Sequence, residues 1–237
     1  MNVTARIDLS HAFVLRPADV AKIWSAFSES IGPVKATARC TDNIEREFNS
    51  ADELTSYENA RPRAIRSLTI RARSKDWDTS ALLHVGSRLS TTIELNLEGP
   101  ESRVLLVRDR LGELFAEIRP WYSMVTRIDF FVVVWAVMAF FVLVLTAMGS
   151  GAKSERTLTF PEAVKAAAIL VVFLGAIGAL IAGINRLRDR FFPVVTFALG
   201  RGQDRYEFDE KIRWVVIIGF LVSAFASLVV AFLITGA

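Results

Sequence analysis

Apolar residues recur at helical spacing in two stretches of the first half of the chain. In residues 16–31 and 101–119 they form one apolar stripe each, which predicts two amphipathic helices. Pro17 stands at the start of the first helix and Gly32 directly after it, as expected for a helix beginning and end. Pro120 ends the second helix in the same way.

Before and between these helices, apolar and polar residues alternate with a period of two. The alternating runs are VTARIDLSHAFVL, VKATARC, NIEREF, IRSLTIRAR, ALLHVGS and TTIELNLE. Short turns join them, which predicts consecutive strands of an antiparallel sheet. The spacing of a capping box at residues 50–53 predicts one short helix among the strands. Residues 1–120 are therefore expected to form an α+β domain, with the two longer helices on one face of the sheet.

The second half of the chain, residues 121–237, contains three long apolar runs that carry no charged residue. A hydrocarbon core of about 30 Å requires roughly 20 apolar helical residues, and each run has about that length. The pattern predicts a region of three transmembrane helices, with spans at about 129–148, 165–185 and 214–235.

Basic residues near these runs predict an orientation. Arg119 and Arg127 precede the first run, and a cluster of Lys and Arg residues separates the second run from the third. Cytoplasmic loops carry the excess of basic residues, and the N-terminus has no signal-peptide pattern. We expect a multi-pass protein of a bacterial inner membrane, with its N-terminal domain in the cytoplasm and its C-terminus outside.

The segment between the second and third runs, residues 186–213, is expected to be a helical stalk with a loop. Opposite charges four residues apart predict that the last helix begins well before its apolar part; the pairs are Arg205–Asp209, Glu207–Lys211 and Asp209–Arg213. Residues 193–199 are too apolar to remain in water. They would lie against lipid headgroups or against the N-terminal domain, where a β-branched run could join a sheet. We favour contact with the domain, which would couple the two regions; a hairpin that couples nothing is the alternative.

The sequence contains no catalytic motif, and we expect a protein that is not an enzyme and binds no cofactor or metal. Cys40 is the single cysteine, so an intramolecular disulfide is excluded, and His11 and His84 are too few for a zinc site with it. Gly200-Arg-Gly202 is interpreted as a turn. The pair Asp76 and Asp78 could hold a divalent metal in a membrane-anchored enzyme. A polar turn between two strands is the simpler interpretation of that pair.

A basic strip is the clearest binding signal. Leu68, Ile70 and Ala72 would point to one side of a strand, and the ligand-binding candidates to the other; these are Arg63, Arg71, Arg73 and Lys75. Such a strip suits an anionic small molecule or nucleotide, lipid headgroups or an acidic protein partner. Alternatively, it is a solvated face neutralised by Glu45, Glu47 and Glu94. The formal net charge is only +3, so no nucleic acid is expected as a partner.

Small residues recur every four positions in the second and third runs. They are Gly175, Ala179 and Gly183 in the second run, and Gly219, Ser223 and Ser227 in the third. Such faces let helices pack closely, which predicts a homo-oligomer in the lipid bilayer. The function expected from all this is a membrane effector whose helices assemble or rearrange on a cytosolic signal, as in a stress or anti-phage response. A membrane scaffold that presents an interaction domain is the alternative.

Overall fold

The computed structural model describes residues 1–86, 91–127, 131–132, 134–136, 138–139 and 160–235 of the chain. The chain divides into two compact units. The first consists of Met1–Ser123 together with Pro193–Ala237, and the second of Met124–Phe192. In the second unit the described helix is α5 (Phe160–Phe191).

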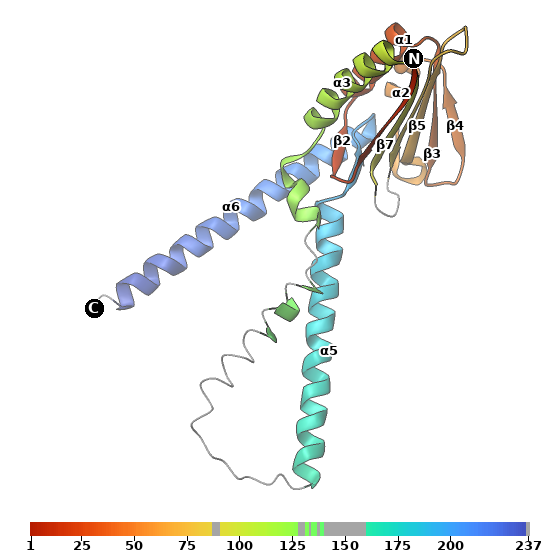
Figure 1. Ribbon diagram of the computed structural model, residues 1–237. Coiled ribbons are helices and arrows are strands. Elements are labelled where there is room, and N and C mark those ends of the chain that lie inside the picture. The colour runs from red at the N-terminus through yellow and green to blue at the C-terminus, as the bar shows by residue number, and fades with distance from the viewer. Residues whose placement is uncertain (87–90, 128–130, 133, 137, 140–159, 236–237) are drawn as a thin grey trace. The chain divides into compact units, whose positions relative to one another are not determined.

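The first unit is built on a six-stranded antiparallel sheet with the order β1-β7-β6-β5-β3-β4 (Figure 1). Its strands are β1 (Asn2–Leu9), β3 (Val34–Cys40), β4 (Glu45–Phe48), β5 (Ile65–Arg73), β6 (Ser80–Gly86) and β7 (Ile93–Pro100). The α+β fold class predicted for this part of the chain is confirmed.

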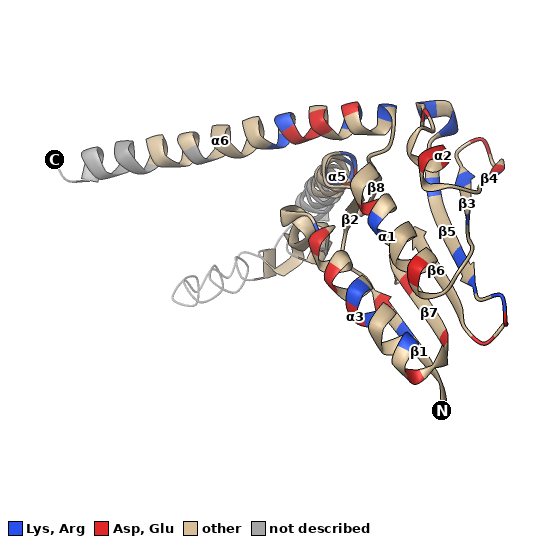
Figure 2. Ribbon diagram, turned by 90° about the horizontal axis from the view of Figure 1, so that it is seen from above, with Lys and Arg blue, Asp and Glu red and all other residues tan. Residues whose placement is uncertain are grey.

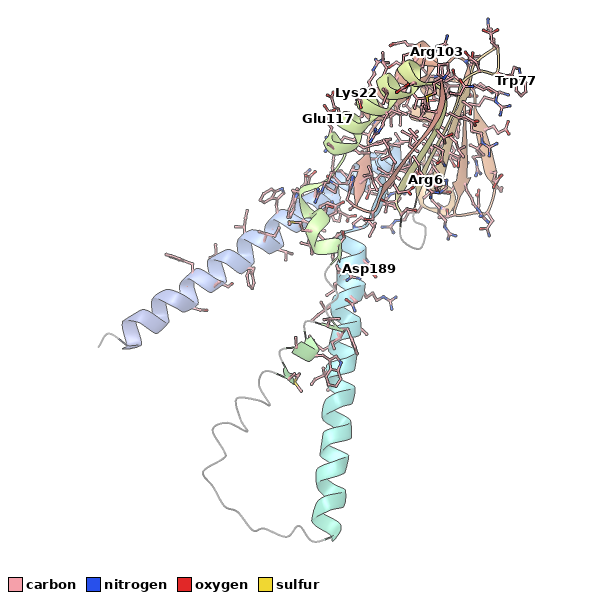
Figure 3. The ribbon with its side chains drawn as sticks, in the orientation of Figure 1. Arg6, Lys22, Trp77, Arg103, Glu117 and Asp189 are labelled. Atoms are coloured by element: carbon pink, nitrogen blue, oxygen red, sulfur yellow. The ribbon has the colours of Figure 1, made fainter. Side chains whose placement is uncertain are left out.

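Two helices, α1 (Pro17–Ser30) and α3 (Glu101–Glu117), cover one face of the sheet, as predicted. The apolar stripe of each helix is buried against inward-pointing strand residues; the helical core residues are Val20, Ile23, Ala26, Phe27, Val104, Val107, Leu111 and Phe115. Lys22 and Glu117 join the two helices by an ion pair of 2.8 Å (Figure 3). The short helix α2 (Ala51–Thr55) begins where the capping box predicts, and the Ser50 side chain accepts a hydrogen bond from the Glu53 N–H.

The first alternating run forms two strands in place of one. β1 lies at the edge of the main sheet, whereas β2 (Phe13–Leu15) pairs in parallel with β8 (Val195–Phe197), a strand from the end of the chain. All three residues of β2 are buried, because β2 is covered on both faces. A continuous apolar triplet is typical of such a strand.

The segment after the second unit therefore returns to the first. Phe197 and Leu199 belong to the same core as the strands of the main sheet. Gly200 then makes a turn at a positive φ of 47°, as the interpretation of Gly200-Arg-Gly202 requires, and α6 (Arg201–Thr235) begins. The expected contact between residues 193–199 and the N-terminal domain is present in the structure.

No helix in the described part of the chain is both long enough and apolar enough to cross a membrane. This finding contradicts the prediction of a multi-pass inner-membrane protein with a cytoplasmic domain and an external C-terminus. The membrane effector and the membrane scaffold depended on those spans, and both functions are wrong on the same ground.

The three predicted spans overlap the described residues only in part. The first expected span, 129–148, falls largely outside the described residues. In α5 the described side chains begin at Gly175, and the basic residues Arg188 and Arg190 occupy its last turn. In α6 the charged segment 201–213 comes first.

Candidate anion-binding site

The outer face of the sheet, opposite α1 and α3, carries the basic residues of the central strands. In β5 the side chains of Leu68, Ile70 and Ala72 are buried. Arg71 and Arg73 alternate with them and are exposed. This alternation follows the prediction, because successive side chains of a strand point to opposite faces. Figure 2 shows Lys and Arg residues along both β3 and β5.

The pairing of β3 with β5 places a lysine beside these arginines. Lys35 of β3 lies directly opposite Arg71, and Leu82 of β6 lies opposite Arg71 on its other side. Together these residues line an open hollow of about 690 Å³. The residues that line the hollow are Thr4, Pro33, Lys35, Arg71, Ala72, Arg73, Ser80, Ala81, Leu82, Asn96, Leu97 and Glu98. We call this the outer-face hollow.

The charges of the outer-face hollow are not balanced within the fold. Like charges directly opposite each other on neighbouring strands are destabilising, and Lys35 and Arg71 are such a pair. Among the residues that the structure describes, none forms an ion pair with Lys35, Arg71 or Arg73. Glu98 brings one carboxylate to the lining, from the side of β7. Three cations against one carboxylate make the outer-face hollow a candidate for binding an anion.

The acidic residues expected to neutralise the strip lie elsewhere on the sheet. Glu45 and Glu47 of β4 pair in register with Arg39 and Thr37. Glu94 of β7 lies 3.4 Å from Arg6 of β1. None of these carboxylates stands opposite Arg71 or Arg73 in the ladder.

The two other predicted binding residues lie outside the outer-face hollow. Arg63 lies in the 3-10 helix η1 (Arg61–Arg63) before β5, and its guanidinium is 3.5 Å from the Glu58 carboxylate. Lys75 lies in the turn between β5 and β6. The structure thus brings together Arg71 and Arg73 and separates Arg63 and Lys75 from them.

Trp77 lies in the turn that joins β5 to β6, next to Arg73 and Ser80, which line the outer-face hollow (Figure 3). Its side chain is 75% exposed, and its backbone has a φ of 62°, in the left-handed region. The guanidinium of Arg73 lies over the indole ring, 4.4 Å from the ring centroid. This cation–π contact fixes the side chain of Arg73 beside the hollow.

Asp78 connects the same turn to α3. Its carboxylate lies 3.2 Å from Arg103 of α3 and accepts a hydrogen bond from the Thr79 hydroxyl. A hydrogen bond with Ser74, the bond with Thr79 and the charge of Arg103 hold the pKa of Asp78 below its usual value. The described residues include no cluster of three or more side chains suited to a metal ion. Asp76 and Asp78 lie in a polar turn, and the Asp78 carboxylate forms an ion pair with the Arg103 guanidinium.

Sequence reasoning missed Lys35, Ser80, Asn96 and Glu98 as lining residues. Lys35, Asn96 and Glu98 lie in predicted strands and Ser80 directly before one, but the sequence did not predict which strands would be neighbours in the sheet. Lys35 follows Pro33 in an ordinary alternating run, and only its pairing with β5 places it at Arg71.

The predicted helix-packing residues are spaced as expected on α5 and α6. A side chain added at Gly175, Gly183 or Gly219 would meet no described atom within 4 Å. The Ser227 hydroxyl donates to the Ser223 carbonyl within α6. That these faces, with Ala179, assemble copies of the chain stays a prediction.

The comparisons with protein-family models and with curated proteins give no match to this chain.

Proposed function

We propose that the chain is a non-enzymatic binding protein whose α+β domain takes an anionic ligand in the outer-face hollow. The observation that carries this proposal is the cross-strand position of Lys35 opposite Arg71, with Arg73 on the same face and no ion-pair partner for any of them among the described residues. An anion bound between these side chains would convert a repulsive pair into two favourable contacts.

The chemistry of the outer-face hollow favours a small phosphorylated ligand. A hollow of about 690 Å³ has the size of sites that accept small molecules. Guanidinium groups bind phosphate oxygens in bidentate fashion, and a lysine adds a point charge. Ser80 and Thr4 supply hydroxyl groups, and Leu82 supplies an apolar floor.

Calorimetric titration of the full chain with inorganic pyrophosphate tests the proposal. We expect binding by the unsubstituted protein and a loss of at least tenfold in affinity on Arg71→Glu or Lys35→Glu. Arg39→Glu is the matched control, because Arg39 is exposed on the same face of β3 but does not line the hollow. Equal loss in the control would indicate a non-specific effect of net charge, and absence of binding to the unsubstituted protein would refute the proposal.

A further inference from the structure

We infer that the ligand of the outer-face hollow is a mononucleotide, with its phosphates at Lys35 and Arg71 and its base stacked on Trp77. The inference rests on the proposed anion binding and adds the nucleoside, which is the part of the ligand that carries the base. Its basis is an exposed indole in contact with Arg73, one of three basic side chains that have no ion-pair partner among the described residues.

The conformation of Trp77 is costly for the isolated protein. A bulky residue that is not glycine rarely adopts a φ of 62°, because this conformation is strained for a side chain with a Cβ. The side chain regains little by packing, since three quarters of it remains exposed. Asn or Gly would suit this turn position better, so the backbone alone does not explain a tryptophan.

The turn holds the indole in place. Thr79 accepts a backbone hydrogen bond from Ser74 at 2.9 Å, and Ser74 accepts one from Trp77 at 3.1 Å. The ion pair between Asp78 and Arg103 fastens the turn to α3. Gly99 of β7 packs so tightly on Thr79 that a Cβ there would approach the threonine methyl group to 2.9 Å. These contacts order the turn that carries Trp77 before a ligand binds. Less conformational entropy is therefore lost when a base stacks on the ring.

Arg73 connects the outer-face hollow with Trp77. Arg73 is a lining residue of the outer-face hollow, and its guanidinium lies over the indole ring. Trp77 is 75% exposed, so its ring has surface available for stacking with a base. Arg73 pairs in register with Ser80, and these two residues flank the turn that carries Trp77. Asn96 and Glu98, on the far side of the hollow from β3, suit the hydroxyl groups of a ribose.

The experiment compares adenosine diphosphate with inorganic pyrophosphate on the full chain, by calorimetry and by quenching of tryptophan fluorescence. A base stacked on an aromatic side chain strengthens binding by about tenfold or more, so we expect adenosine diphosphate to bind that much more tightly than pyrophosphate. Trp77→Gly suits the positive φ and should reduce the ratio of the two affinities to near one. Trp77→Phe keeps an aromatic face and should retain most of the ratio.

The outcomes separate the two proposals. If pyrophosphate binds and Trp77→Gly leaves the affinity ratio unchanged, the mononucleotide inference is wrong and the anion site stands. If neither compound binds, the proposed function itself fails. If a single-stranded oligonucleotide binds and adenosine diphosphate does not, the ligand is a nucleic acid and the inference is overturned.

Discussion

The side-chain amide of Asn59 donates hydrogen bonds to the carbonyl oxygens of Phe197 at 2.9 Å and Leu199 at 3.2 Å. Its Oδ1 accepts a third hydrogen bond, from the N–H of Ile65. One side chain thus joins the start of β5 to β8 and to the residues that lead into α6. Asn59 is 2% exposed and has a φ of 48°, a conformation in which Asn is enriched among residues other than glycine.

Replacing Asn59 with alanine is expected to destabilise the first unit by about 3 kcal/mol. The change leaves an N–H and two carbonyl groups without their partner in a buried site, and each such loss costs roughly 1–3 kcal/mol. Urea denaturation followed by circular dichroism measures the difference. Asn59→Gly keeps the positive φ and isolates the hydrogen bonds, so it should be nearly as unstable. A change below about 0.5 kcal/mol in both variants would show that these bonds contribute little.

Gly200→Ala is expected to be strongly destabilising, whereas Gly112→Ala is expected to be neutral or stabilising. A Cβ at Gly200 would collide with the carbonyl oxygen of Tyr57, and the φ of 47° is itself unfavourable for alanine. Gly112 lies in α3 with no described atom within 4 Å of an added Cβ, and alanine is favoured over glycine in a helix by roughly 1 kcal/mol. Melting temperatures of the two variants, measured side by side, should move in opposite directions.

The aromatic pocket around Arg213 predicts a dependence of stability on alkaline pH. Arg213 is 1% exposed and lies between the rings of Tyr122 and Tyr206, at 4.5 and 5.1 Å from their centroids. Burial raises the pKa of Tyr122 above its ordinary value, although the charge of Arg213 opposes this shift. Because the folded-state pKa is the higher one, the folded protein holds this proton more tightly than the unfolded chain.

The contribution of Tyr122 is therefore complete below pH 10, the ordinary pKa of tyrosine, and is lost as the pH rises through the folded-state pKa. Urea titrations from pH 8 to above pH 10 should show a steeper loss of stability in the unsubstituted protein than in Tyr122→Phe. Parallel curves for the two proteins would contradict the expected shift.

Local pattern was sufficient for the two longer helices, for most strands of the main sheet and for half of the basic strip, but it did not separate β1 from β2. The period of two in β5 correctly assigned Leu68, Ile70 and Ala72 to the core and Arg71 and Arg73 to the outer face. Lys35 could not be found in this way, because its role depends on β3 lying next to β5, and strand order is a long-range property. Arg63 was assigned to the strip by spacing alone, but the strand begins two residues later.

The membrane prediction failed for a different reason. It was inferred from the length and composition of three apolar runs, whereas the described residues form no helix that is both long enough and apolar enough to cross a membrane. The described parts of α5 and α6 do not contain one. The β8 segment shows the opposite case, since the same compositional argument correctly indicated that residues 193–199 must pack against another part of the protein.

The last prediction concerns the cost of the anion site to the fold. If Lys35 and Arg71 are kept opposite each other for a ligand, then removing their repulsion should stabilise the empty protein. Lys35→Glu places a carboxylate opposite Arg71, and an opposite-charge cross-strand pair is worth roughly 0.2–1 kcal/mol. We therefore expect this variant to unfold at a higher urea concentration than the unsubstituted protein while its affinity for pyrophosphate falls.

The control variant should behave in the opposite way on both measures. Arg39→Glu faces Glu45 across the ladder, so it creates a like-charge pair and should lower the stability by a similar amount. Because Arg39 does not line the outer-face hollow, pyrophosphate binding should persist. A binding site predicts that Lys35→Glu gains stability and loses pyrophosphate binding. It predicts that Arg39→Glu loses stability and keeps pyrophosphate binding. If Lys35→Glu instead destabilises the protein, the cross-strand pair is not repulsive in the folded state and the argument for a ligand between these two side chains is lost.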